Sequence, residues 1–316
     1  MQNKIVPTVN LAQFVNGSAA ERAAFVRELG GAFETVGFVA VSGHGISADL
    51  IADFYKNAKV FFANDTDTKK RYEVNGLAGQ RGYTSFGKEH AKQSNVGDLK
   101  EFFQIGQMPD NDADRAVYPT NVNVDIVPSF TEQGAQLYKA FETSGGHLLR
   151  AVALHLGLDE QYFTQKIANG NSILRAIHYP PITAEPLTAI RAEQHEDINL
   201  ITLLVGASAG GLELLTMDNE WVAVVPEEGE IVINVGDMLQ RLTNNTLKST
   251  THRVVNPPRE EWHTARLSIP FFLHPRSEMD LSCLAKCVTA ENALAYEPIT
   301  AGDYLDERLR EIGLKK

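Results

Sequence analysis

Short apolar runs of strand length follow one another from residue 173 onward, and this pattern constrains the fold more than any other feature of the sequence. The runs are rich in Val, Ile, Leu and Thr and are separated by Gly, Asn, Asp and Pro, which is typical of strands joined by turns. Strands at such close spacing favour a sandwich or jelly roll over a parallel sheet. The seven predicted strands are residues 173–179, 199–205, 212–217, 221–225, 231–235, 247–255 and 264–273.

The first half of the chain is expected to be mainly helical and to support the strands from outside. Ser18 and Glu21 form a capping box, in which each side chain satisfies a free N–H group at a helix start. A second helix is expected to begin near Ser47, and a third, long helix at a second capping box formed by Ser129 and Glu132. Apolar residues recur at helical spacing after each of these starts.

The chain is expected to form one compact unit with three regions. Residues 1–125 are mainly helical, residues 126–275 hold the long helix and the jelly-roll core, and residues 276–316 form a helical tail. A short strand is predicted over residues 38–41. The Gly-rich segment 75–98 has no regular period and is predicted to be a long loop that, like the tail, could cover a site.

Charge and composition limit the partners that this chain can have. Asp and Glu number 40 against 29 Lys and Arg, and the longest basic cluster is residues 69–71, so neither nucleic acid nor an anionic membrane is an expected partner. No run approaches the roughly 20 apolar residues of a membrane span, and no signal peptide is evident. A small-molecule ligand and a cytoplasmic location are expected, and the oligomeric state is unknown. Cys283 and Cys287 are expected to be ordinary reduced thiols.

One histidine begins the pattern His-x-Asp, at His195-Glu196-Asp197, directly before the apolar run 198–205. Residues two apart in an extended chain point to the same face, so His195 and Asp197 could reach one ion together, whereas Glu196 points to the other face. His252 follows in another strand-like segment. Two imidazoles and one carboxylate on rigid strands form the facial triad of non-haem Fe(II) sites, which leaves coordination positions open for chemistry.

A further pair with strand spacing follows the second histidine, at Arg266-Leu-Ser268. The guanidinium of Arg266 is suited to bidentate capture of a carboxylate, and the hydroxyl of Ser268 can donate a further hydrogen bond. A dicarboxylate co-substrate would fit this pair.

The order His195-x-Asp197, His252, Arg266-x-Ser268 resembles that of the 2-oxoglutarate-dependent Fe(II) oxygenases of the isopenicillin N synthase-like superfamily. That family's pattern is His-x-Asp, a long stretch, His, and then Arg-x-Ser. The likeness extends over nearly the whole chain. Further matching segments are residues 6–11, 37–39, 43–46, 82–83, 98–102, 210–212, 234–240, 242–244 and 248–255.

The resemblance implies a fold and an activity. The fold is an all-β core with helical support, a double-stranded β-helix of the jelly-roll, cupin-like type flanked by N-terminal helices. The activity is that of a non-haem dioxygenase that uses Fe(II), O2 and 2-oxoglutarate to oxidise a small molecule, with release of succinate and CO2. Hydroxylation, desaturation or ring closure is expected rather than halogenation, because Asp197 leaves no coordination site for a halide.

The resemblance also implies roles for individual residues. His195, Asp197 and His252 would be the iron ligands and the catalytic centre, while Arg266 and Ser268 would hold the distal carboxylate of 2-oxoglutarate.

The segment 174–180 resembles the family's Asn-Tyr-Tyr-Pro motif, which approaches the co-substrate. Tyr179 is retained, but Ile177 stands in place of the Asn and His178 in place of the first Tyr. Only Tyr179 is therefore expected to contact 2-oxoglutarate.

Strand alternation nominates three further residues for contact with the substrate. Arg175 shares a face with Ile177 and Tyr179, which would aim its guanidinium into the barrel. A buried arginine needs an anion, so Arg175 either pairs with a protein carboxylate or binds an acidic group of the substrate. By the same alternation, Asn199 should follow Asp197, and Phe272 should follow Ser268, onto the inward face.

Two alternatives stay open. The protein could be an Fe(II)/O2 oxidase of the same fold that does not use 2-oxoglutarate, an option that the departure at Ile177 supports. It could also be a non-enzymatic ligand-binding barrel with a structural metal, although such sites are usually closed by a fourth ligand. The remaining histidines, among them His44 and His178, are expected to have packing or hydrogen-bonding roles.

Overall fold

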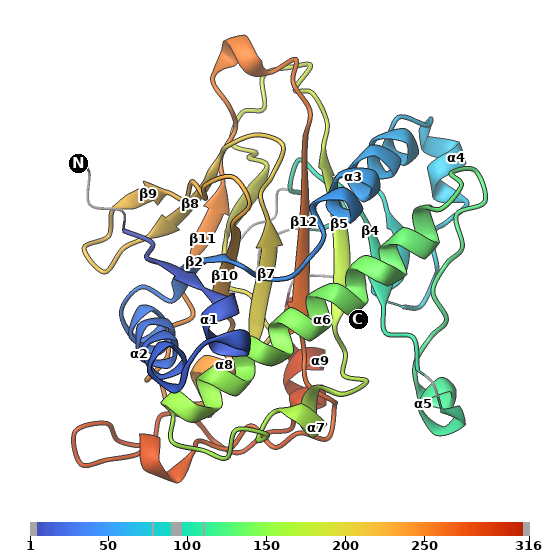
Figure 1. The fold of residues 1–316 in the computed structure, drawn as a ribbon. Coiled ribbons are helices and arrows are strands. Elements are labelled where there is room, and N and C mark those ends of the chain that lie inside the picture. The colour runs from blue at the N-terminus through green and yellow to red at the C-terminus, as the bar shows by residue number, and fades with distance from the viewer. Residues whose placement is uncertain (1–4, 78, 90–96, 110, 312–316) are drawn as a thin grey trace.

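Two β-sheets form the centre of the computed structural model, which describes residues 5–77, 79–89, 97–109 and 111–311 (Figure 1). The larger sheet has eight described strands in the order β1-β2-β10-β7-β12-β5-β4-β3, and the smaller has four in the order β6-β11-β8-β9. The bounds of the larger sheet's strands are β1 Thr8–Asn10, β2 Phe38–Ser42, β3 Gly82–Thr84, β4 Glu101–Gly106, β5 Ile173–Tyr179, β7 Ile201–Val205, β10 Ile231–Val235 and β12 Arg266–Leu273. Those of the smaller sheet are β6 Ala192–His195, β8 Leu212–Leu215, β9 Trp221–Ala223 and β11 His252–Val254.

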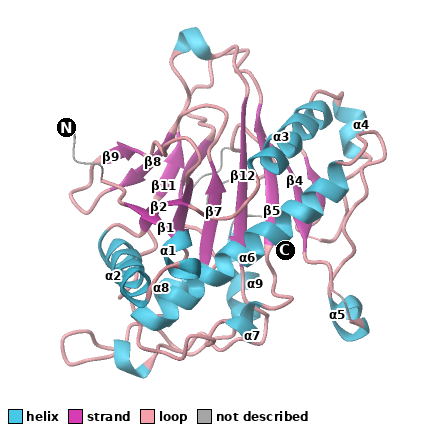
Figure 2. Cartoon of the chain, in the orientation of Figure 1, coloured by secondary structure: helices cyan, strands magenta, loops and turns pink. Residues whose placement is uncertain are grey.

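Helices cover one face of the larger sheet, and the long helix α6 runs across β7, β12, β5 and β4 (Figures 1 and 2). No helix among the described residues has the length and apolar character needed to cross a bilayer. The α-helices are α1 Leu11–Asn16, α2 Ala19–Thr35, α3 Ala48–Phe62, α4 Thr66–Lys70, α5 Asp112–Val117, α6 Phe130–His155, α7 Thr164–Ile167, α8 Asp237–Leu242 and α9 Ala301–Glu311. Two short 3₁₀ helices are η1 Arg259–Glu261 and η2 Ala285–Cys287.

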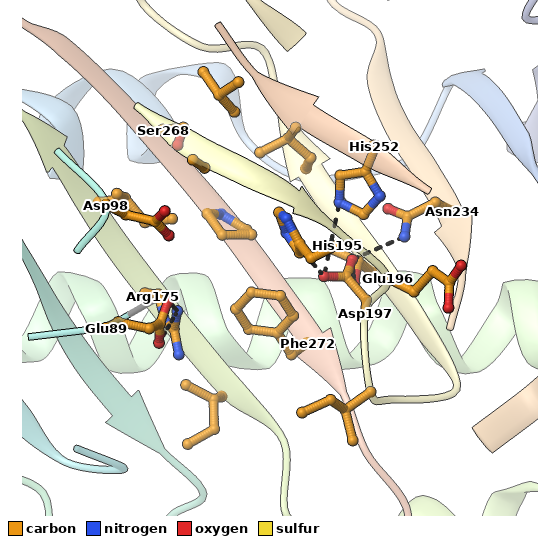
Figure 3. A pocket seen from close by; sticks show the side chains of 18 of the residues that line it. Glu89, Asp98, Arg175, His195, Glu196, Asp197, Asn234, His252, Ser268 and Phe272 are labelled. Carbon is orange, nitrogen blue, oxygen red and sulfur yellow. Dashed lines mark hydrogen bonds and ion pairs between the residues drawn. The ribbon is translucent and has the colours of Figure 1, made fainter. Parts of the chain in front are cut away.

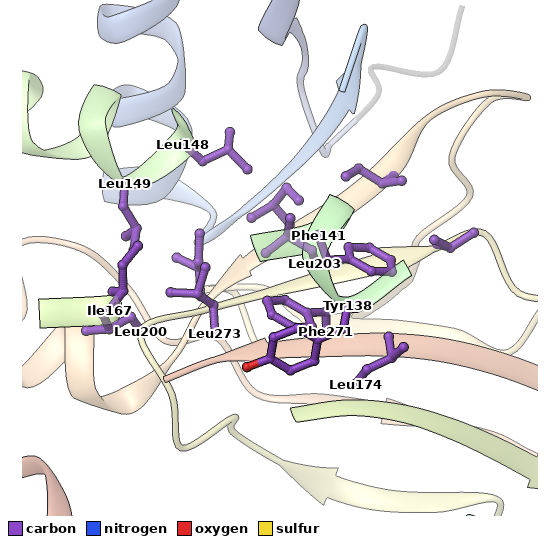
Figure 4. Packing of buried hydrophobic residues seen from close by; sticks show 14 of the residues in the cluster. Tyr138, Phe141, Leu148, Leu149, Ile167, Leu174, Leu200, Leu203, Phe271 and Leu273 are labelled. Carbon is purple, nitrogen blue, oxygen red and sulfur yellow. The ribbon is translucent and has the colours of Figure 1, made fainter. Parts of the chain in front are cut away.

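The main hydrophobic core lies between α6 and the larger sheet (Figure 4). The ring of Phe271 stacks on Phe141 with centroids 5.5 Å apart and meets Tyr138 edge-on at 5.0 Å. Gly145 lets the helix approach the sheet closely, because a Cβ there would lie 2.4 Å from Leu273 Cδ1. This packing fixes β12, the strand that carries Arg266 and Ser268, against a rigid support.

Truncation of Phe271 to alanine is expected to lower the free energy of unfolding by about 3–5 kcal/mol, because its fully buried ring would leave a cavity that rigid neighbours cannot fill. Chemical denaturation followed by circular dichroism measures the change. The control is Phe86→Ala, since the Phe86 side chain is 50% exposed and its removal should cost less than about 0.5 kcal/mol. Equal losses in the two variants would contradict the packing described here.

A second, smaller cluster of buried residues lies between the two sheets. Phe38 and Val232 of the larger sheet contribute to it together with Leu214 and Val254 of the smaller one. Because this cluster does not fill the whole space between the sheets, a cavity remains there, and it is lined by residues of both.

The structure confirms much of the predicted element order and corrects parts of it. The strands predicted at 173–179 and 231–235 have those bounds, whereas the one predicted at 247–255 shrinks to β11. The first half of the chain contains β1, β3 and β4, which were not predicted, and β3 interrupts the segment expected to be one long loop. Within that predicted loop, residues 78 and 90–96 lie outside the described residues.

The two predicted capping boxes have different outcomes. Ser18 and Glu21 form theirs, with both reciprocal hydrogen bonds present. The box at Ser129 and Glu132 is wrong, because Ser129 has a φ of 66° and its side chain makes no capping hydrogen bond. In this left-handed conformation Ser129 cannot have the extended backbone that an N-cap serine requires.

Candidate active site

Three side chains that the sequence singled out converge in the cavity between the sheets (Figure 3). One nitrogen each from His195 and His252 and one oxygen of Asp197 lie within 4.8 Å of one another. The two Nε2 atoms are 3.9 and 3.8 Å from Asp197 Oδ1. His195 on β6 and His252 on β11 are register partners across the antiparallel ladder, and this pairing places their rings 4.4 Å apart.

The backbone sets the tautomer of both imidazoles. His195 Nδ1 lies 2.6 Å from the carbonyl oxygen of Glu193, and His252 Nδ1 lies 3.1 Å from that of Thr250. A carbonyl oxygen only accepts, so each Nδ1 must carry the hydrogen, and each Nε2 lone pair is free for a metal. Burial lowers the pKa of His195 to about 4, and the adjacent His252 ring contributes to this shift. The neutral imidazole that a metal requires is therefore the resting form of His195.

Asp197 does not lie on the same strand as His195, contrary to the prediction. β6 ends at His195, and Asp197 belongs to the connection that precedes β7. The chain bends over residues 198–200, so strand alternation cannot be continued from Asp197 into the following strand. Thr202 and Leu204 of β7 line the cavity, and Leu203 packs on the opposite face in the main core.

Asn199 is the substrate candidate that this bend removes from the cavity. Its side chain is completely buried, it is not part of the cavity lining, and its Nδ2 donates to Thr202 Oγ1 at 2.8 Å. The prediction that Asn199 faces the substrate is therefore wrong. It belongs instead to a chain of hydrogen bonds behind the metal-binding triad.

That chain of hydrogen bonds holds one oxygen of Asp197. Thr202 Oγ1 and Asn234 Nδ2 donate to Asp197 Oδ2 at 2.6 and 2.8 Å, which leaves Oδ1 facing the two imidazoles. Burial alone would raise the pKa of Asp197, but the neighbouring His252 and His195 and these two hydrogen bonds lower it overall. A carboxylate held in this way is ionised and directed to bind through a single oxygen.

Replacement of Thr202 with valine is expected to weaken metal binding by about 10–100-fold, the usual cost of losing a partner that orients a ligand. Valine keeps the shape of threonine but cannot donate to Asp197 Oδ2. The Kd for Co(II), measured by its visible absorption, reports the effect without turnover. Thr216→Val, directly after β8 and outside the cavity, is the control and should leave the Kd unchanged. A Kd within about threefold of the original in Thr202→Val would show that the hydrogen bond does not orient the ligand.

The cavity has a volume of about 400 Å³ and is lined by the triad and by alternate residues along β5 and β12. At one end lie Arg266, Ser268 and Tyr179, which cross-strand pairing brings together: Arg266 is the register partner of Tyr179, and Ser268 that of Ile177. Arg266 is 2% exposed, its Nε donates to the carbonyl of Ala209, and its Nη1 is buried without a hydrogen-bond partner. The guanidinium carbon lies 5.0 Å from the centre of the Tyr179 ring.

At the other end lies Arg175, which faces the cavity as strand alternation predicted. Of the two options given for it, the structure shows pairing with a protein carboxylate: Nη1 is 3.2 Å from both oxygens of Glu89. Its Nε donates to Gln104 Oε1 at 2.9 Å. Phe272 also lines this end, between Arg175 and the triad in Figure 3, with its ring centre 5.1 Å from the guanidinium carbon.

Three other side chains have the structural roles expected of them. His178 points away from the cavity, hydrogen-bonds to Glu101 at 2.7 Å and stacks on Phe62. His44 accepts from the N–H of Ile46 and contacts the carbonyl of Gly229. Glu196 accepts a hydrogen bond from Thr251 and is not part of the triad.

Several lining residues were not predicted from the sequence. Glu89 comes from the predicted loop and Gln104 from an unassigned segment, and no local pattern could show that they contact Arg175. Lys100, which contacts Glu89, lies in a segment that resembles the family but was given no role. Asn234 lies in a segment that resembles the family, and the sequence could have nominated it by that match alone. The described part of α9 adds Leu305, Arg308 and Leu309 to the wall, a contact that requires the fold of the tail to be known.

Comparison with known proteins agrees with this geometry. Residues 6–125 match the family model of the N-terminal region of non-haem dioxygenases in morphine synthesis, and residues 170–275 match that of the 2OG-Fe(II) oxygenase superfamily. The 2-oxoglutarate-dependent dioxygenase htyE of Aspergillus rugulosus is 31% identical over 95% of each chain.

Two solved structures are similar over almost the full length. A 2OG-Fe(II) oxygenase family protein of Caulobacter crescentus is 43% identical with a TM-score of 0.86, covering 97% of this chain and 99% of its own. A full-length protein of Neurospora crassa, solved in complex with alpha-KG and thymine, is 27% identical with a TM-score of 0.86, covering 98% of each chain. These neighbours confirm the double-stranded β-helix predicted from the sequence. The chain belongs to the 2OG-Fe(II) oxygenases, enzymes that use Fe(II), 2-oxoglutarate and O2.

Proposed function

We propose that His195, Asp197 and His252 hold Fe(II), and that Arg266, Ser268 and Tyr179 hold 2-oxoglutarate, in a dioxygenase that oxidises a small polar molecule. One observation carries the proposal: the two free Nε2 atoms and Asp197 Oδ1 share a cavity with a buried arginine that has an unpartnered nitrogen. Three N and O ligands on one side of an ion leave the other side open, as the facial triad requires.

Arg266, Ser268 and Tyr179 lie at what we call the inner end of the cavity, and these residues suit a dicarboxylate. Arg266 makes no ion pair with any described residue, so its buried charge favours an anion, and a carboxylate can accept from its free Nη1. Ser268 Oγ and Tyr179 line the same end and offer further hydrogen bonds. A keto acid anchored here by one carboxylate has its other end directed toward the triad.

Bound Fe(II) would supply the oxidative chemistry, in which 2-oxoglutarate and O2 are converted to succinate and CO2 as the substrate is oxidised. The protein supplies position and exclusion of water. Asp197 binds through one oxygen because the other is saturated by Thr202 and Asn234. The apolar side chains of Leu204, Leu212 and other lining residues keep the cavity dry around the reacting groups.

In this proposal the substrate lies at the opposite, outer end of the cavity, beside Arg175 and Phe272. Support for a small molecule comes from the volume, since about 400 Å³ lies near the low end of the range for ligand pockets and must also hold 2-oxoglutarate. The similar structure from Neurospora crassa contains thymine together with alpha-KG, and thymine is also small. Hydroxylation, desaturation and ring closure all agree with a substrate held at this end of the cavity.

Anaerobic titration with Fe(II) and 2-oxoglutarate tests the proposal. The visible charge-transfer band of the chelate should appear, and admission of O2 should then yield succinate in proportion to the O2 consumed. O2 uptake without succinate would indicate an oxidase that does not use 2-oxoglutarate. Fe(II) binding with neither a band nor O2 uptake would overturn the proposal in favour of a non-enzymatic barrel.

A further inference from the structure

Two of the arginines that line the cavity, Arg266 and Arg175, have charges that are balanced differently. Arg266, at the inner end, has no carboxylate partner within the described part of the chain. Arg175, at the outer end, has both oxygens of Glu89 at 3.2 Å from its Nη1. The first arginine therefore still requires an anion, and the second does not.

At the outer end, the charge of Arg175 is balanced within a group of four charged side chains, all of which line the cavity. Lys100 Nζ bridges Glu89 Oε1 at 2.7 Å and Asp98 Oδ2 at 2.8 Å, and Glu89 in turn contacts Arg175. The side chains of Glu89, Asp98 and Lys100 are less than 10% exposed, and that of Arg175 is 15% exposed. We call these four residues the outer charge cluster. Two positive and two negative groups give it no net charge.

The protonation states preserve this balance. Burial alone would raise the pKa of Glu89, but Arg175 and Lys100 outweigh it and lower the pKa well below its usual range. Burial alone would lower the pKa of Lys100, but Glu89 and Asp98 raise it above the usual range. Both groups are therefore charged at neutral pH.

Arg175 is held rigidly and keeps one nitrogen free. Nε is bound to Gln104 and Nη1 to Glu89, whereas Nη2 donates to no described residue. The guanidinium carbon lies 4.1 Å from the centre of the Phe102 ring, which fixes its plane. Such a group offers a directed hydrogen-bond donor without an uncompensated charge. A neutral acceptor can use this donor, whereas a carboxylate would also meet the negative charge of Glu89.

We propose that the substrate is a small uncharged molecule with a carbonyl-type acceptor, which Arg175 Nη2 binds while the rest of the molecule lies against Phe272. This inference rests on the proposed function, because it assumes that 2-oxoglutarate occupies the inner end. The unpaired Arg266 then selects an anion, and the neutralised Arg175 selects against one. This difference between the two ends keeps the substrate and the co-substrate from exchanging places.

Binding of a charge-matched series of fragments tests the inference. The probes are 2-piperidone and glutarimide, which are neutral cyclic amides, with valerate as an anion and 5-aminovalerate as a zwitterion of the same carbon count. Ligand-observed NMR on full-length protein loaded with Zn(II) and 2-oxoglutarate measures their affinities without turnover. At least one neutral amide should bind saturably and at least tenfold more tightly than valerate and 5-aminovalerate. Equal or tighter binding of a carboxylate, or no saturable amide binding, would overturn the inference.

Two variants assign the selectivity to the outer charge cluster. Arg175→Gln should remove the amide binding, since the glutamine amide is too short to reach the position of Nη2 while Lys100 still holds Glu89. Glu89→Gln should improve valerate binding at least tenfold relative to the amide, since it leaves Arg175 without its counter-ion. The control is Glu160→Gln, which removes the carboxylate paired with Arg150 outside the cavity and should change neither affinity.

The double variant Glu89→Gln/Arg175→Gln keeps the test decisive if Glu89→Gln alone does not fold. It removes one charge of each sign, so valerate should gain nothing over the original protein. A gain for valerate in the double variant would overturn the inference. The charge-transfer band with Fe(II) and 2-oxoglutarate, measured on the unchanged protein, separates a failure of the proposed function from a failure of this inference. Absence of the band contradicts the proposed function, whereas an intact band with carboxylate-selective binding contradicts this inference alone.

Discussion

Replacement of His252 with alanine is expected to abolish the charge-transfer band with Fe(II) and 2-oxoglutarate and to lower succinate release by more than about 100-fold. The physical reason is the loss of one of three ligand atoms that lie within 4.8 Å of one another. Changing a residue that only orients a ligand already costs about 10–100-fold in metal affinity, so removal of the ligand itself must cost more.

The experiment needs a control for loss of a buried imidazole, because the His252 ring also contacts Phe38 edge-on at 5.5 Å. Thermal unfolding of the metal-free protein measures this packing contribution separately. His263→Ala removes an exposed imidazole outside the cavity and should leave the band intact. A band of full strength in folded His252→Ala would contradict the assignment of the triad.

The parts of the site that the sequence predicted lie on regular strands. On β5 and β12 the side chains alternate without interruption, so Arg175 and Tyr179, and likewise Ser268 and Phe272, all reach the cavity as expected. Antiparallel pairing of these strands then joins Arg266 to Tyr179 in register. Here a period of two in the sequence is enough to predict which side chains share a face.

The prediction fails where the chain leaves a strand. Asp197 and Asn199 were read as one extended segment with β7, but both lie in the connection before β7, which bends over residues 198–200, and Asn199 is buried behind the triad. Apolar residues continue through this bend, and their pattern does not show where the strand begins. The position of Asp197 was still predicted to be near His195, because the two are close in sequence whatever the backbone does between them.

Of the outer charge cluster, only Arg175 was predicted to face the cavity, and the carboxylate that pairs with it could not be identified from the sequence. Glu89, Lys100 and Arg175 come from three separate parts of the chain, and their contacts depend on the pairing of β4 with β5 and on the segment that precedes β4. Charged residues in a sequence usually indicate an exposed surface. Only the three-dimensional structure shows that these charges are buried and balanced.

Replacement of Arg266 with methionine is expected to weaken 2-oxoglutarate binding by about 30-fold to more than 1000-fold. Removal of one partner from a buried charge-assisted contact costs about 2–5 kcal/mol, and each 1.4 kcal/mol is tenfold in affinity. The Kd for 2-oxoglutarate is measured anaerobically with Fe(II) present, and the Kd for Co(II) in the absence of 2-oxoglutarate should stay the same. Arg253→Met, which removes a half-exposed arginine paired with Glu213 outside the cavity, is the control.

The same substitution should not destabilise the protein without its ligand, and this second result separates a binding role from a structural one. Arg266 is buried with an unpartnered Nη1 and no described carboxylate, so its charge is an energetic cost until an anion arrives. Methionine fills a similar volume without that cost, so the free energy of unfolding should stay equal or rise. A structural arginine would show the reverse, with a large loss of stability and little change in the Kd for 2-oxoglutarate. Weaker 2-oxoglutarate binding together with unchanged or higher stability would show that the charge of Arg266 serves the ligand, at the expense of the unliganded fold.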